Sequence, residues 1–171
     1  VSFTLTYLGD LYKNMGNLDK ALKYYQKSII SNIDNFNNEN VYINPSINDL
    51  DPEFNKFVTL YKKAYTLYDI YIEKSKNSHE LEVSLETSKL AIALFESILA
   101  SYKDENTKIM INEYVYDIYN LVVLIATELY SKNNNPKYLD IAFEYSEKGK
   151  AAILLSSIRG FAALEIGNIP V

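Results

Sequence analysis

Residues 5–26, LTYLGDLYKNMGNLDKALKYYQ, decide the fold of this chain. Apolar residues recur there every three or four positions on both sides of Gly16-Asn17, and this spacing is typical of helices. We predict one helix over residues 2–15 and a second over residues 18–32, with Asn17 as the cap of the second. The first helix is expected to turn these side chains inward: Phe3, Leu5, Leu8, Leu11 and Tyr12. Two helices joined by a glycine turn predict an antiparallel hairpin.

Helical spacing continues along the chain, which contains only four prolines and five glycines. After an Asn-rich loop over residues 35–50, Asp51 is expected to cap a third helix that has Pro52 in its first position and ends near Lys76. Three further helices are expected over residues 78–102, 105–131 and 136–159, the first of them capped by Asn77 or Ser78. Residues 160–171 are expected to form a tail, with a short helical turn at 161–164.

Composition excludes several classes of function. Hydrophobic residues make up 48% of the chain, which is enough for a sizeable core. The chain has no cysteine and a single histidine, His79, so we predict no thiol nucleophile, no catalytic site, no metal site and no cofactor. Seventeen basic residues against 22 acidic ones argue against a nucleic-acid partner. No apolar run is long enough for a membrane span, and we expect a cytoplasmic protein that starts inside a longer polypeptide.

Internal repetition bears on how six helices are arranged. Leu18-Asp19-Lys20-Ala21 recurs as Leu139-Asp140-Ile141-Ala142, followed in both cases by a tyrosine and then a lysine at the same spacing. Small residues at repeated positions let neighbouring helices approach closely. The repetition favours stacked helical hairpins, and a four-helix bundle with two extra helices is the alternative.

The first hairpin resembles a tetratricopeptide repeat. Leu5-x2-Leu8-Gly9-x2-Tyr12 and Ala21-x3-Tyr25 follow that family's pattern, with Leu5 in place of its tryptophan and without its closing proline. The resemblance implies an all-α, right-handed solenoid of about three hairpins. Its segments would be a repeat over 1–34, a loop over 35–52, hairpins over 53–103 and 104–160, and a tail over 161–171.

Residues 142–155, AFEYSEKGKAAILL, resemble the last helix before the protease domain of CHAT proteins, which are caspase-like proteins associated with tetratricopeptide repeats. Gly167-Asn168-Ile169-Pro170 resembles the turn that follows, with Asn168 inserted. The resemblance implies a downstream caspase-like cysteine protease domain, which cannot lie in a chain without cysteine. The residues expected to link to that domain are Glu147, Lys150, Leu155, Ile158 and Phe161.

Two sets of residues are candidates for binding a protein or peptide partner. The repeat resemblance implies that the concave face of the first helix carries Phe3, Thr6, Asp10, Lys13 and Asn14. Helical spacing also places Tyr61, Tyr65 and Tyr68 in one stripe, which serves either as packing between hairpins or as a partner groove. We therefore predict a non-enzymatic interaction scaffold, the regulatory arm of a CHAT-type protease. The alternative is a free-standing adaptor or the sensor arm of another signalling protein.

Overall fold

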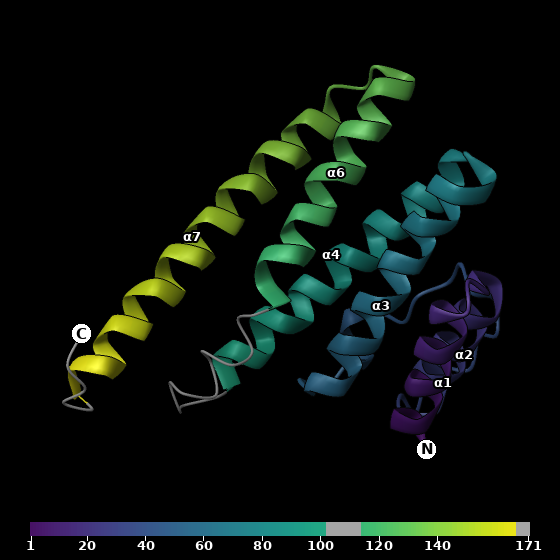
Figure 1. Ribbon diagram of the computed structural model, residues 1–171, viewed down its shortest axis with the longest axis horizontal. Coiled ribbons are helices and arrows are strands. Elements are labelled where there is room, and N and C mark those ends of the chain that lie inside the picture. The colour runs from purple at the N-terminus through teal and green to yellow at the C-terminus, as the bar shows by residue number, and fades with distance from the viewer. Residues whose placement is uncertain (102–113, 167–171) are drawn as a thin grey trace. The chain divides into compact units, whose positions relative to one another are not determined.

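The computed structural model describes residues 1–101 and 114–166 of the chain, and its description of side chains ends at Ile158 and leaves out residues 115 and 156. Every regular element in the described ranges is helical, which confirms the prediction of an all-α fold. The chain forms two compact units, Val1–Ile98 and Leu99–Val171. The elements, drawn in Figure 1, are α1 (Ser2–Asn14), α2 (Leu18–Ile30), the 3-10 turn η1 (Ile47–Asp49), α3 (Phe54–Ile70), the π-helical segment η2 (Tyr71–Ser75), α4 (Ser78–Ser101), α6 (Val115–Asn133) and α7 (Lys137–Ile166).

The first hairpin forms as predicted. Gly16 adopts φ +72°, a backbone conformation that glycine takes without steric cost, and the Asn17 side chain accepts a hydrogen bond from the Lys20 backbone N–H at 3.2 Å. The α1 and α2 helices lie so close together at Gly9 that a methyl group there would collide with the ring of Tyr25. The hairpin is therefore joined by direct contact between backbone and ring.

The prediction for the α1 side chains is wrong at two positions. Phe3 and Leu11 were expected to face inward, but more than half of each side chain is exposed. The reason is geometric. Thr6 and Gly9 lie on the buried side of α1, and because successive residues of a helix are 100° apart, Phe3 and Leu11 then lie on the exposed side.

The start of α3 also differs from the prediction. The helix begins at Phe54, with Glu53 in an extended conformation before it, so Pro52 precedes the helix instead of opening it. The Glu53 backbone N–H donates to the Asp51 carbonyl at 2.8 Å, and the Asp51 carboxylate lies 3.4 Å from the Lys56 ammonium. Asp51 therefore closes a turn and holds a lysine, and it does not cap the helix.

The α3 and α4 helices pack against each other within the first unit. The rings of Phe57 and Phe95 lie 5.1 Å apart between centroids, and the Ser84 hydroxyl donates to the Ala64 carbonyl at 2.7 Å. Between the helices, Lys76 takes a left-handed conformation, and the Asn77 side chain accepts from the His79 backbone N–H at 3.1 Å. The predicted start of this helix is therefore confirmed.

In the second unit, α6 and α7 form an antiparallel pair (Figure 1). The predicted fifth helix began at residue 105, but residues 105–113 lie outside the described residues. The α7 helix runs to Ile166, so the tail predicted from residue 160 is helical over its first seven residues. A glycine inside a helix costs only about 1 kcal/mol, and the residues that follow Gly160 include strong helix formers.

The core of the second unit includes α6 side chains that are almost completely buried, among them Ile118, Val122, Ile125 and Leu129. On α7, Ala142 and Tyr145 are buried, and Tyr145 lies 6.1 Å from Tyr119 between ring centroids. In the ranges that the structure describes, we find no helix whose length and apolar content would suit a membrane crossing.

Candidate functional site

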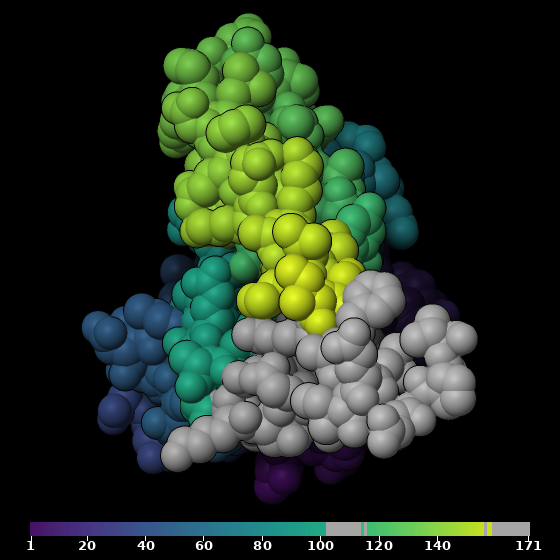
Figure 2. Space-filling view, turned by 90° about the vertical axis from the view of Figure 1, so that its left-hand side faces the viewer, coloured from purple at the N-terminus to yellow at the C-terminus, as the bar shows by residue number. Residues whose placement is uncertain are grey.

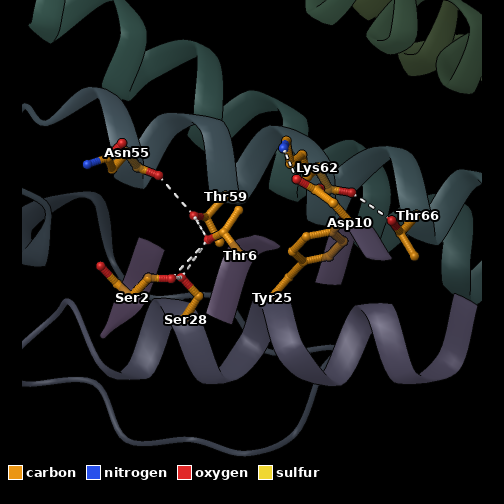
Figure 3. Close-up of polar contacts among 9 residues, drawn as sticks. All are labelled: Ser2, Thr6, Asp10, Tyr25, Ser28, Asn55, Thr59, Lys62 and Thr66. Carbon is orange, nitrogen blue, oxygen red and sulfur yellow. Dashed lines mark hydrogen bonds and ion pairs between the residues drawn. The ribbon is translucent and has the colours of Figure 1, made fainter. Parts of the chain in front are cut away.

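Thr6 lies at the centre of a hydroxyl cluster that joins three helices (Figure 3). Its hydroxyl oxygen is 2.8 Å from that of Ser28 on α2 and 2.9 Å from that of Thr59 on α3. The Ser28 hydroxyl donates to the Ser2 carbonyl at 2.8 Å. Thr6 is buried, so its predicted place on an open concave face is wrong: α3 covers this position of α1.

A second set of contacts joins α1 to α3 about one turn further along. The Tyr25 hydroxyl donates to Asp10 at 2.8 Å, and the Lys62 ammonium of α3 lies 2.5 Å from the other oxygen of the same carboxylate. Lys13 forms an ion pair with Asp69 at 2.7 Å. Asp10 and Lys13 are therefore engaged within the first unit.

Phe3 and Asn14 differ from the other candidates of α1 because both are exposed. They lie near opposite ends of the helix. The structure therefore does not assemble the five predicted α1 residues into one open site. It brings three of them together as the contact between the first and second hairpins.

We expect Thr6→Val to lower the free energy of unfolding by about 1–2 kcal/mol, because the isosteric change removes one hydroxyl from a buried cluster. Urea denaturation followed by circular dichroism measures the change. The control is Thr4→Val, the same substitution on an exposed position of α1, which should stay within about 0.5 kcal/mol of the wild type. Equal values for the two variants would show that the cluster contributes nothing.

The predicted tyrosine stripe is part of an aromatic ladder along α3. Ring centroids are 6.0 Å apart between Phe57 and Tyr61 and 4.9 Å apart between Tyr61 and Tyr65. Tyr61, Tyr65 and Tyr68 are half-buried, whereas Phe57 is fully buried. The ladder therefore starts in the core and reaches the surface, and a partner-binding role for its exposed edges stays a prediction.

Lys63 is a buried polar residue that we did not predict. Its ammonium donates to Gln26 Oε1 at 2.7 Å, to Asn44 Oδ1 at 2.8 Å and to the Ile43 carbonyl at 3.0 Å. Asn44 in turn donates to the Thr87 hydroxyl of α4 at 2.9 Å. The network joins α2, α3 and α4 to the segment that connects α2 with α3.

Burial of the Lys63 side chain lowers its pKa to about 7, because its ammonium has left water for a site that offers three neutral oxygens. The burial of Lys63 could have been predicted from the sequence. Lys63 stands three residues after Leu60 and four before Leu67, both buried on α3, so helical spacing places it among core residues. Because Lys63 is fully buried, no substrate can reach its amine as a nucleophile. Its hydrogen bonds therefore have a structural role and hold these segments together.

The predicted link residues on α7 fall into two groups. Lys150 and Glu147 form an exposed ion pair at 2.7 Å. The predicted apolar link residues Leu155 and Ile158 are 46% and 56% exposed. Their neighbours Ile153 and Leu154, which were not predicted as link residues, are 41% and 62% exposed. Figure 2 shows α7 in yellow-green and yellow on the face that is turned to the viewer. The side chain of Phe161 lies outside the described residues.

Helical spacing also predicts that Ile153 and Leu154 pack on the preceding helix together with Ile141 and Tyr145. This prediction is wrong for Ile153 and Leu154, because their side chains are exposed. Gly149 explains the contact that does form: the missing side chain lets α7 approach α6, where an added methyl group would lie 3.1 Å from the Tyr119 Cβ atom. Next to it is a hollow of about 220 Å³ between the helices, lined by Tyr116, Tyr145 and Ile153 among others.

We found no group of three or more histidine, cysteine or acidic side chains placed to hold a metal ion within residues 1–101 and 114–166. Comparisons with protein-family models, curated proteins and solved structures gave no match to this chain. The resemblances to tetratricopeptide repeats and to CHAT proteins therefore rest on the quoted residues alone and stay predictions.

Proposed function

We propose that this chain is a protein-interaction scaffold built as a tetratricopeptide-like solenoid, and that it is the regulatory arm of a caspase-like protease. Three contacts support the solenoid. Gly9 gives Tyr25 room between α1 and α2, Thr6 connects the first hairpin to α3, and Ser84 binds α4 to α3. Each hairpin of the first unit thus contacts its neighbour in the sequence, as helical repeats do.

The exposed apolar surface of α7 is the observation that carries the proposal. Leu154, Leu155 and Ile158 lie within five residues on one helix, and each is about half exposed or more. Contiguous apolar surface of this kind marks interaction sites in proteins. Because the quoted CHAT resemblance lies on the same helix, we assign this surface, here called the α7 link, to contact with a protease domain.

Sequencing the gene beyond Val171 is the first test, because the proposal requires a region with a His–Cys pair there. The second test expresses that region separately and titrates it with the 171-residue chain by calorimetry. We expect Leu155→Ser/Ile158→Ser to weaken binding at least about tenfold, which corresponds to 1.4 kcal/mol. The melting temperature of the isolated chain should hardly change, because both side chains are exposed.

Phe143→Ser provides the matched control, since Phe143 is an even more exposed apolar residue on the same helix but lies outside the α7 link. It should bind like the wild type. A caspase-like region that binds the double variant and the wild type equally would overturn the α7 link. A gene without such a region would leave the free-standing adaptor as the function.

A further inference from the structure

One face of α1, continued by Met15 directly after the helix, is largely apolar and carries no charge. Its apolar side chains at every fourth position are between 53% and 68% exposed: Phe3, Tyr7, Leu11 and Met15. The uncharged polar side chain of Asn14 is also exposed on this face, near its end. The only charged residues of α1 are Asp10 and Lys13, and both are paired with residues of α3. At 1.5 Å per residue this stripe is about 18 Å long, or between three and four turns.

The neighbouring helix α2 presents a row of lysines. Lys20, Lys23 and Lys27 are exposed and follow one another at helical spacing. Among the residues that the structure describes, none of them has a carboxylate within 4.0 Å, whereas the one acid of α2, Asp19, is paired with Lys74 at 2.9 Å. A chain with a net charge of −5 thus keeps three unneutralised lysines together on one helix.

A pair of tyrosines connects the stripe to the lysine row. Tyr12 of α1 and Tyr24 of α2 are stacked with their centroids 5.1 Å apart. The Lys20 ammonium lies 5.1 Å from the ring centre of Tyr12, and that of Lys27 lies 5.7 Å from that of Tyr24. The apolar stripe, the tyrosine pair and the lysine row therefore form one continuous surface, here called the hairpin face.

A hollow of about 470 Å³ borders the hairpin face on its lysine side. Lys23, Lys27 and Ile30 line it from α2, and Glu39 and Val41 line it from the connecting segment. Ile30 and Val41 are the apolar residues of this lining, and Glu39 is its single acid beside the two lysines. The hollow extends the hairpin face as a concave edge.

We propose that the hairpin face binds an amphipathic helix of a partner protein, whose apolar side lies on the α1 stripe and whose acidic residues face the lysines of α2. The proposal deepens the interaction function proposed above, but it uses the first unit and not the α7 link. Two observations favour a helix. A ridge of residues at every fourth position fits between the ridges of a second helix, and the lysines require opposite charges along one border.

An anionic membrane surface would also accept apolar residues and lysines. The overall net charge of −5 opposes it, because a bilayer of anionic lipids would repel most of the chain. A helix contacts only the hairpin face and avoids that repulsion. We therefore assign the surface to a protein helix.

The test uses the full 171-residue chain and two labelled peptides of about 18 residues, each helical over five turns. Both peptides carry leucines on one side, and one has glutamates along the borders where the other has lysines. Fluorescence anisotropy should show that the glutamate peptide binds at least about tenfold more tightly at low salt, and that added salt reduces the difference. Tyr7→Ser/Leu11→Ser should weaken this binding about tenfold.

Charge is tested separately with Lys20→Gln/Lys27→Gln, which should remove most of the preference for glutamate and its dependence on salt. Phe143→Ser on α7 is the control and should bind the peptide like the wild type. Equal binding of the two peptides, or unchanged binding by Tyr7→Ser/Leu11→Ser, would overturn the proposal. Three other outcomes would also overturn the proposal. The first is a dimer in sedimentation that Tyr7→Ser/Leu11→Ser dissociates, since a second copy would then cover the hairpin face. The others are displacement of the glutamate peptide by a peptide encoded before Val1, and tighter binding to phosphatidylserine vesicles than to the glutamate peptide. None of these outcomes affects the α7 link.

Discussion

Replacing Gly9 by valine should lower the free energy of unfolding by about 3 kcal/mol. Overpacking a well-filled contact costs about 1–3 kcal/mol, and here the added atoms would meet a ring that is itself held in place. Tyr25 is completely buried, and its hydroxyl is bonded to Asp10. The α1 and α2 helices would have to separate, so part of that hydrogen bond should be lost as well. Urea denaturation followed at 222 nm measures the change.

A double substitution tests whether the clash is the cause. Tyr25→Leu removes the ring atoms that the valine would meet, so Gly9→Val should cost much less in that background, and the two effects should not add. Thr4→Val serves again as the control for a valine on the same helix. Additive losses in the double variant would mean that Gly9 acts through backbone flexibility and not through contact with Tyr25.

The hairpin of α1 and α2 could be predicted from the sequence because local rules determine it. Gly16 and Asn17 terminate one helix and cap the next, and both act within four residues along the chain. The start of α4 at Asn77 was predictable for the same reason. Pro52 illustrates the limit of such rules, since the turn closed by Asp51 and Glu53 moved the start of α3 two residues beyond it.

The side of α1 that is buried could not be predicted in the same way. Apolar residues surround most of that helix, so its sequence alone does not determine which side is buried. The choice depends on Gly9 and on the polar residues Thr6, Asp10 and Lys13, which contact residues more than 15 positions away or on α3. Polar side chains thus mark the buried side of α1 near α3, and apolar ones mark its exposed side.

The continuation of α7 through Gly160 is a second case. The glycine suggested a helix end, but no proline or Asn-rich turn follows until residue 168. The candidate sites were the least predictable part, because they depend on pairs of distant residues. Lys63 meets Gln26 and Asn44 only after three segments have come together.

The stability of the first unit should rise between about pH 6 and pH 9, by about 3 kcal/mol. The direction of this change follows from Lys63. Burial lowers the pKa of Lys63 to about 7 in the folded chain, below the usual lysine value of 10.5. Between these two values the unfolded chain binds a proton that the folded chain does not, so raising the pH favours the folded state. Above about pH 10 the trend should reverse, because burial and the hydrogen bond to Asp10 raise the pKa of Tyr25.

The variant Lys63→Met isolates this effect. It should flatten the rise in stability between about pH 6 and pH 9, because its buried side chain does not titrate. The variant should also lower the free energy of unfolding by about 1–3 kcal/mol near pH 9. At that pH the neutral amine of Lys63 still donates two hydrogen bonds to the three oxygens of Gln26, Asn44 and Ile43, and methionine donates none. Lys62→Met removes the neighbouring lysine, which is partly exposed, and should keep the wild-type slope. Urea denaturation of the three proteins across this range measures both effects. A slope that Lys63→Met leaves unchanged would place the titrating group elsewhere, and the network around Lys63 would then hold a permanently charged lysine.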